Sequence, residues 1–254
     1  LPDAFAVAAF QQIAVFDSGV GGISTLKEME KLMPAEDFVY YADNLNAPYG
    51  VRSHDEIRLL ALRSMDKIAA ANPKAIVVAC NTVTEVCIGD IRRAYPDVPV
   101  FGLQPAVKPA PKRTLVLVTE ATASSAAFRE FVARHDGAYV FPLAEAAGMI
   151  ERGESDGKLT EYLAERFSGI NKAEFSSAVL GCTHYVLKKR CFAAALGLPL
   201  YDGNAGLAKH VAGALAVKNL LARGRQKGGV RINLSDCSTS EFAKYAAFCG
   251  GCAP

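Results

Sequence analysis

The sequence has no strong excess of charge of either sign and no long uninterrupted apolar run. Over 254 residues, 28 lysines and arginines oppose 26 aspartates and glutamates, which gives a formal net charge of +2. This balance produces no strong field for nucleic acid or for an acidic membrane surface. No stretch offers the roughly 20 consecutive apolar residues that a membrane-spanning helix needs. We therefore expect neither nucleic acid nor a membrane as a partner.

The usual signs of a secreted protein are also missing. The seven cysteines are an odd number scattered through an ordinary globular composition, unlike a disulfide framework. Residues 1–12 are apolar but have no basic region, since the first lysine is Lys27. We expect a cytoplasmic chain with reduced thiols, in which residues 1–12 are a pendant start or an addition outside the fold.

Signals for a metal or a cofactor are weak. Cys249-Gly-Gly-Cys252 has the spacing of half a zinc site or of a redox pair, but no second pair accompanies it. No lysine stands at an expected strand end beside a phosphate cup, as a pyridoxal Schiff base would require. The sequence therefore predicts no metal and no cofactor.

What the sequence does contain is a regular alternation of strand and helix patterns. Hydrophobic residues make up 51% of the chain against 21% charged residues, which excludes disorder. Short β-branched runs, for example residues 13–17, 75–79, 114–118 and 176–180, alternate with segments of helical spacing. This order predicts an α/β fold with mostly parallel sheets. We expect residues 142–154 to be irregular and a helix to run from Asn204 through Leu221.

One short phrase occurs twice, once in each half of the chain. Residues 76–84 read Ile-Val-Val-Ala-Cys-Asn-Thr-Val-Thr, and residues 178–186 read Ala-Val-Leu-Gly-Cys-Thr-His-Tyr-Val. In both, an apolar strand and a small residue lead to a cysteine followed by polar residues. Because α/β sheets bind ligands at the carboxyl ends of their strands, Cys80 and Cys182 are candidate site residues. The repeat predicts two related halves that face each other, each with one thiol in a shared cleft.

The residues near these cysteines indicate acid/base chemistry. A free thiol with a pKa of about 8.5 is only a few per cent ionised at neutral pH. Asp17 ends the first strand and His184 lies two residues beyond Cys182, so both are placed to accept or relay a proton. Removing a proton from one face of a carbon and returning one to the other face needs two equivalent groups. The duplicated thiols favour that reaction over a single nucleophile or a dithiol redox pair.

A glycine-rich turn, Ser18-Gly-Val-Gly-Gly22, joins the first strand to a helix. Such a turn either presents backbone N–H groups to an anion or allows close packing, and the sequence does not separate the two.

Five short motifs follow one another along the chain. They are Phe16-Asp-Ser-Gly-Val-Gly-Gly22, Ala42-Asp43 with Pro48-Tyr-Gly50, Val78-Ala-Cys-Asn-Thr82, Thr119-Glu-Ala-Thr122, and Leu180-Gly-Cys-Thr-His-Tyr185. Each is weak alone, but the set in this order is specific. From Ile13 onward, the chain resembles the glutamate racemase branch of the aspartate/glutamate racemase family.

The resemblance implies a fold and an activity. It implies two pseudo-symmetric α/β lobes, each a mostly parallel sheet flanked by helices, with an amino acid held between them. We place the first lobe at residues 13–105 plus 211–254 and the second at residues 106–210. The implied activity is cofactor-independent interconversion of L- and D-glutamate, supplying D-glutamate for peptidoglycan. The assembly is left open, a homodimer being one option.

The resemblance also implies residue roles. Cys80 and Cys182 would be the acid/base thiols, with Asp17 assisting Cys80 and His184 assisting Cys182. A glutamate would complete the second half; Glu145 begins the family segment, but Glu151 better fits the spacing back from Cys182 and is preferred. The residues expected to hold the substrate's ammonium and carboxylates are Ser18, Pro48, Tyr49, Gly50, Asn81, Thr82, Thr119, Thr122 and Thr183.

The sequence departs from the family pattern at Asn44, Gln104 and Val186, which affects loop geometry more than chemistry. Two alternatives stay open. One is a related two-cysteine racemase or isomerase acting on aspartate, hydantoins or maleate, which comparing turnover of glutamate and aspartate would test. The other is a protein that binds an amino acid or a macromolecular partner without catalysis, for which an inert stoichiometric glutamate complex would be the sign.

Overall fold

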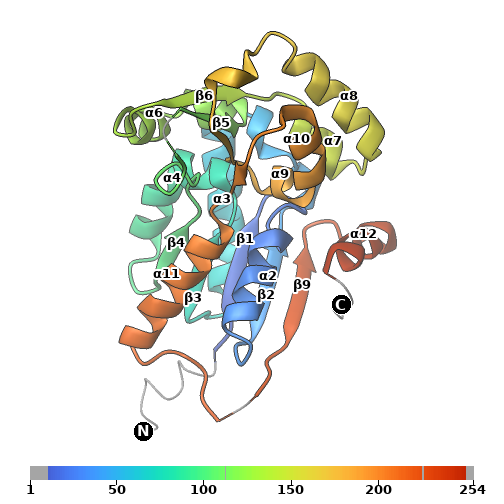
Figure 1. The fold of residues 1–254 in the computed structure, drawn as a ribbon. Coiled ribbons are helices and arrows are strands. Elements are labelled where there is room, and N and C mark those ends of the chain that lie inside the picture. The colour runs from blue at the N-terminus through green and yellow to red at the C-terminus, as the bar shows by residue number, and fades with distance from the viewer. Residues whose placement is uncertain (1–10, 112, 225, 250–254) are drawn as a thin grey trace, which may run out of the picture.

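The protein consists of two parallel β-sheets, each covered by helices, stacked end to end (Figure 1). The computed structural model describes residues 11–111, 113–224 and 226–249. The expectations for residues 1–10 and for Cys252 lie outside the described residues. None of the helices within these ranges combines the length and the apolarity needed to cross a membrane.

The first sheet has five parallel strands in the order β4-β3-β1-β2-β9. These are β1 (Ile13–Asp17), β2 (Phe38–Ala42), β3 (Ala75–Val78), β4 (Val100–Gly102) and β9 (Val230–Leu234). Every residue of β1, β2 and β3 is buried, because helices cover both faces. One face packs on α2 (Ile23–Leu32) and α11 (Asn204–Val217), and the other on α3 (His54–Ala69) and α4 (Asn81–Ala94).

The second sheet has four parallel strands in the order β6-β5-β7-β8. Its strands are β5 (Thr114–Val118), β6 (Ala138–Pro142), β7 (Ser177–Leu180) and β8 (Leu200–Tyr201). The helices of this lobe are α5 (Glu120–Ser124), α6 (Ala126–Ala133), α7 (Ala146–Glu151), α8 (Asp156–Arg166), α9 (Thr183–Leu187) and α10 (Lys189–Leu196).

The two sheets repeat one topology. If the strands of each lobe are counted in chain order, both sheets run second, first, third, fourth, and β9 is added beside β2 in the first sheet. Cys80 follows the third strand of the first sheet, and Cys182 follows the third strand of the second. The predicted fold class, two pseudo-symmetric α/β lobes, is confirmed.

The remaining elements are short 3₁₀ helices and one helix near the C-terminus. The 3₁₀ helices are η1 (Asn44–Asn46), η2 (Tyr49–Val51) and η3 (Lys172–Glu174); the last helix is α12 (Thr239–Cys249), which follows β9 at the edge of the first sheet and on the side of the second lobe (Figure 1).

Two local expectations were wrong. Residues 146–151 form α7 rather than an irregular stretch, because Ala146, Ala147 and Ile150 bury a short apolar face in the second core. The helix α11 ends at Val217 rather than at residue 221, since Asn219 adopts a left-handed conformation (φ 54°) that cannot continue a helix. The helix α11 also packs against α2, although the expected lobe boundary between residues 210 and 211 falls inside it. The lobe boundaries stay a prediction.

Candidate active site

Each of the two repeated cysteines occupies the N-cap of the helix that follows its strand. Cys80 begins α4 and Cys182 begins α9, and both are free thiols that are only 5% and 6% exposed. The Cys80 thiol lies 3.7 Å from the hydroxyl of Ser18, which follows β1, the neighbouring strand. The positive end of α4 near the Cys80 sulfur is a place where a thiol can change its ionisation state.

The surroundings of Cys80 favour the protonated thiol. Burial is the main reason that the pKa of Cys80 is raised above its usual range, and the negative charge of Asp17 raises it further. The backbone N–H of Val83 and the hydroxyl of Ser18 oppose these effects but do not outweigh them. At neutral pH this sulfur therefore carries a proton that it can donate.

Cys182 lies at the end of a buried relay. Its sulfur is 3.9 Å from Nδ1 of His184, and Nε2 of the same ring is 2.7 Å from Oε2 of Glu151. Burial alone would lower the pKa of His184, but the hydrogen bonds with Cys182 and Glu151 reverse this and raise the pKa well above its ordinary value. Burial would likewise raise the pKa of Glu151, but His184, the Val20 N–H and Lys244 lower it to about 2. The relay thus holds the His184 imidazolium between the Cys182 sulfur and the Glu151 carboxylate.

Asp17 is the second buried carboxyl of the site, at the end of β1. Its Oδ1 accepts a hydrogen bond from the Gly19 N–H (2.9 Å), and its Oδ2 accepts one from the Thr183 hydroxyl (3.0 Å). Burial raises the pKa of Asp17 to about 6, against the lowering effects of His184 and of these two donors. A carboxyl with that pKa exchanges a proton readily near neutral pH, as a group that assists a thiol should.

The glycine-rich turn between β1 and α2 packs against the second lobe instead of presenting an empty anion cup. The N–H of Gly19 is bonded to Asp17, and the N–H of Val20 donates to Glu151 Oε2 at 2.9 Å. A Cβ on Gly19 would lie 2.1 Å from Glu151 Oε2, and a Cβ on Gly21 would lie 2.4 Å from the hydroxyl oxygen of Thr183. Close approach is therefore why the turn needs glycine.

Three threonines from the two lobes form a cluster of hydroxyls. Thr82 on α4 lies 3.0 Å from Thr119, and Thr122 on α5 contacts both, at 3.2 Å from Thr82 and 3.0 Å from Thr119. Gly50 lies against the same cluster, because a Cβ there would be 2.5 Å from Cγ2 of Thr119. Hydroxyl groups that now bond one another can turn to bind a carboxylate, so the cluster suits the expected substrate contacts.

The other expected binding residues are engaged in loop contacts. Asn81 donates from Nδ2 to the Leu103 carbonyl at 3.0 Å, and Tyr49 donates to Asp43 Oδ2 at 2.6 Å. Pro48 is half-buried in the loop before η2. The charge of Cys80 is among the causes that raise the pKa of Tyr49, after burial and Asp43, which places this ring near the first thiol.

The geometry favours Glu151 over Glu145 as the glutamate of the site. The Glu145 side chain is 60% exposed and lies 3.8 Å from Arg152, whereas the Glu151 side chain is 8% exposed and bonds His184.

Sequence reasoning missed two residues of α12, Lys244 and Tyr245. Lys244 Nζ is 3.1 Å from Glu151 Oε1, and the Tyr245 hydroxyl is 3.4 Å from the same oxygen. A helical pattern near residues 241–248 predicts the helix but gives no sign of which lobe it touches.

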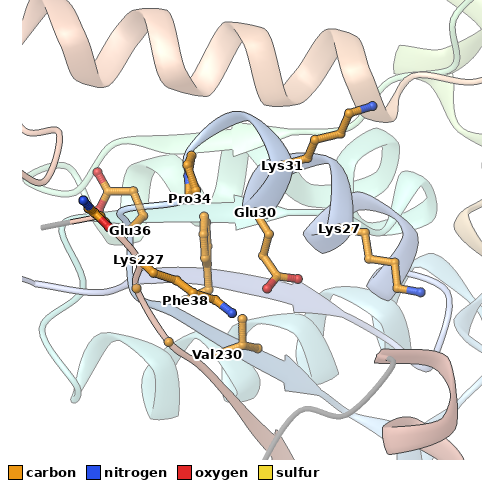
Figure 2. Close-up of a pocket in the computed structure, with 11 residues that line it drawn as sticks. Lys27, Glu30, Lys31, Pro34, Glu36, Phe38, Lys227 and Val230 are labelled. Carbon is orange, nitrogen blue, oxygen red and sulfur yellow. The ribbon is translucent and has the colours of Figure 1, made fainter.

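A separate cavity of about 510 Å³ lies at the other end of the first sheet (Figure 2). Its walls come from α2, the turn after it, the first residue of β2 and the segment that leads into β9, and include Lys27, Glu30 and Lys227. Because the thiols follow the carboxyl ends of strands and this cavity meets the amino ends, it is not part of the site. Within the described residues, no group of three or more histidine, cysteine, aspartate or glutamate side chains could hold a metal ion.

Known proteins are similar to this chain in sequence and in fold. The sequence profile described as Asp/Glu/Hydantoin racemase matches residues 13–211. A glutamate racemase of Clostridium acetobutylicum is 39% identical over 230 residues, covering 87% of this chain and 90% of the relative. The crystal structure of glutamate racemase from Thermus thermophilus with β-chloro-D-alanine has a TM-score of 0.79 and 29% identity, covering 95% of this chain and 93% of the other. That of the Francisella tularensis enzyme with D-glutamate shares the fold, with a TM-score of 0.86, 24% identity and coverage of 97% and 96%. The chain belongs to the Asp/Glu/hydantoin racemase family.

Proposed function

We propose that this protein interconverts L- and D-glutamate by transferring protons at Cα between two thiols, without a cofactor. One observation carries the proposal: Cys80 and Cys182 are free, buried thiols at equivalent positions of two sheets with the same strand order. Simple binding of an amino acid does not need such a pair, whereas exchange of a proton between opposite faces of one carbon does. The similarity to curated glutamate racemases supports glutamate as the substrate.

In the L-to-D direction, the thiolate of Cys182 takes the Cα proton, so the C–H bond breaks and its electron pair stays on the substrate. Cys80 then donates its S–H proton to the opposite face of the same carbon. Nδ1 of the His184 imidazolium, which Glu151 holds through Nε2, lies 3.9 Å from the Cys182 sulfur and pairs with the thiolate. Burial keeps Cys80 protonated, as the donor must be. In the D-to-L direction the roles reverse, and Asp17 receives the proton that Cys80 must lose.

The substrate would lie between the lobes, fixed by hydroxyl, amide and backbone groups. The cluster of Thr82, Thr119 and Thr122 offers hydroxyls from both lobes for a carboxylate. Ser18 and Thr183, together with Asn81 and the segment Pro48-Tyr49-Gly50, complete the proposed contacts. We further propose that the product D-glutamate supplies peptidoglycan synthesis in the cytoplasm.

The decisive experiment is circular dichroism of L-glutamate incubated with the purified protein and no added cofactor. We expect the optical signal to decay to zero, because the two enantiomers have equal free energy. Cys80→Ala and Cys182→Ala variants serve as controls and should leave the signal constant. A constant signal with the natural chain would overturn the proposal.

The same assay with L-aspartate separates glutamate from the other substrates of the family. We expect glutamate to be turned over with the higher kcat/KM. A stoichiometric glutamate complex without turnover would instead indicate a binding protein.

A further inference from the structure

The carboxylate of Glu151 is held by donors from three different segments. His184 and the Val20 N–H donate to Oε2, at 2.7 and 2.9 Å. On Oε1, Lys244 lies at 3.1 Å and the Tyr245 hydroxyl at 3.4 Å. The first pair comes from α9 and the glycine-rich turn, and the second comes from α12. Among the residues that the structure describes, the donors to Oε1 of this buried carboxylate all come from α12, so both of its oxygens are satisfied when α12 is docked.

Further contacts hold the Lys244 ammonium beside Glu151. The Lys244 side chain is 22% exposed, and its ammonium also bonds the backbone carbonyl of Glu151 at 3.2 Å. Glu241, one turn earlier, pairs with the same ammonium at 2.7 Å and accepts a hydrogen bond from Asn44 at 3.0 Å. Oδ1 of Asn44 also accepts a hydrogen bond from the Asp236 N–H at 2.9 Å, so the loop after β2 anchors the segment that leads into α12.

Resting on the proposed function, we propose that Lys244 is a positioning residue that acts on the second thiol through Glu151 and His184. Its ammonium holds the Glu151 carboxylate in place and partly neutralises the negative charge that the carboxylate presents to the His184 imidazolium. Without the positive charge of Lys244, Glu151 would bind the His184 proton more strongly, and His184 would exchange protons with Cys182 less readily. Acid/base groups work best when their pKa lies near the operating pH.

The kinetic test compares the natural chain with Lys244→Met, which keeps most of the length of the side chain and removes its charge. We expect kcat to fall about tenfold with little change in KM, since Lys244 is not proposed to touch the substrate. The loss in kcat/KM must be equal in the two directions, because the equilibrium constant between enantiomers is one. Lys244→Arg keeps the charge and should restore most of kcat.

A double-mutant cycle separates this role from simple docking of α12. If Lys244 acts through Glu151, then Lys244→Met should cost much less in a Glu151→Gln background than in the natural chain. Equal losses in the two backgrounds would overturn the proposal. The matched control is Lys188→Met, because Lys188 has a 21% exposed side chain paired with Asp156 and contacts neither thiol. Its kcat should stay within about twofold of the natural value.

Proton NMR at fixed pH gives a readout that does not depend on turnover. Nε2 of His184 lies 2.7 Å from Oε2 of Glu151, and the loss or shift of a resonance in Glu151→Gln identifies the Nε2 proton between them. In Lys244→Met, the carboxylate becomes a stronger acceptor, so this resonance should move further downfield. It should not move in Lys188→Met.

An unchanged resonance, an upfield shift or loss by exchange with water would show that Lys244 only docks the helix, and would overturn the proposal. If the natural chain racemises nothing while the downfield shift occurs, then the proposed function fails and the role of Lys244 on His184 stands.

Discussion

Thr183 donates a hydrogen bond to Asp17, with Oγ1 3.0 Å from Oδ2, and so joins the first residue of α9 to the last residue of β1. These residues belong to different lobes, and each neighbours a group of the proposed proton path. The contact therefore couples the geometry of the Cys182 half to the ionisation of the carboxyl proposed to assist Cys80. It also means that the hydroxyl expected to hold the substrate tunes an acid/base group.

Replacing Thr183 by alanine tests this coupling. The hydrogen bond lowers the pKa of Asp17, so its loss should move that pKa higher than about 6. The acidic limb of the kcat/KM profile should shift to higher pH, and kcat/KM at neutral pH should fall about tenfold, as for loss of a hydrogen bond to a charged group. Thr160→Ala, which removes a hydroxyl bonded to the Asp156 carbonyl on α8, is the control. An unaltered profile would remove Thr183 from the site.

The buried Asp17 carboxylate should lower the free energy of unfolding at neutral pH. Burial raises its pKa from 3.8 to about 6, so the folded state binds this proton more tightly than the unfolded state does. Stability is therefore greatest below pH 3.8 as far as Asp17 is concerned, and it declines as the pH rises to 6. The shift corresponds to about 3 kcal/mol at higher pH.

Asp17→Asn should remove this penalty while abolishing activity. We expect the variant to be more stable than the natural chain at pH 7.5, with the advantage shrinking towards pH 4. Urea unfolding of both proteins at the two pH values measures it. Since asparagine can still accept the Gly19 N–H, the local fold should persist. A stability difference that does not change with pH would contradict the assignment of the raised pKa.

The sequence was informative where local patterns decide structure. The strands at residues 13–17 and 114–118 have the expected bounds, and a capping box between Ser53 and Glu56 starts α3. Cys87 and Cys191, which lie on helices, are buried in two different cores. Periodicity and capping chemistry act within a few residues, so one sequence carries them.

What one sequence did not reveal depends on contacts between distant segments. The pairing of Glu151 with His184 spans 33 positions, and that with Lys244 spans 93. No periodic pattern encodes which lobe a helix touches, so α12 was expected as a helix but not as part of the site. The glycine-rich turn also left two interpretations open, because the residue that excludes a side chain at Gly19 comes from the other lobe.

Gly19 offers a steric test of the site. A Cβ at this position would lie 2.1 Å from Glu151 Oε2 and 3.1 Å from His184 Nε2. Gly19→Ala should displace the carboxylate from the imidazole and lower kcat by about a hundredfold or more. The matched control is Gly206→Ala on α11, where a Cβ meets nothing within 4 Å. It should leave activity unchanged and raise stability by up to about 1 kcal/mol, as alanine does in a helix. Full activity in Gly19→Ala would exclude a need for the Glu151–His184 contact.

The distance between the two thiols is a direct geometric prediction. If both sulfurs address one carbon at about 3–3.5 Å, they should lie roughly 6–8 Å apart with the substrate between them. A crystal structure of the protein with glutamate bound measures this separation. Sulfurs on unrelated surfaces of the bound substrate, or joined in a disulfide, would end the two-thiol mechanism.

Exchange with heavy water distinguishes two thiols from one shared base. Thiol protons exchange with solvent while the site is empty, so in deuterium oxide Cys80 should deliver deuterium to the D-glutamate formed. The remaining L-glutamate should at first stay unlabelled, because returning to it uses the proton that Cys182 has just removed. Cys80→Ala and Cys182→Ala should each abolish racemisation and leave at most a partial exchange at the surviving thiol, with L-glutamate for Cys182 and with D-glutamate for Cys80. Proton NMR at Cα follows both enantiomers after chiral separation. Equal early labelling of substrate and product would indicate a single base, and full racemisation by either variant would exclude that cysteine as an essential acid/base group.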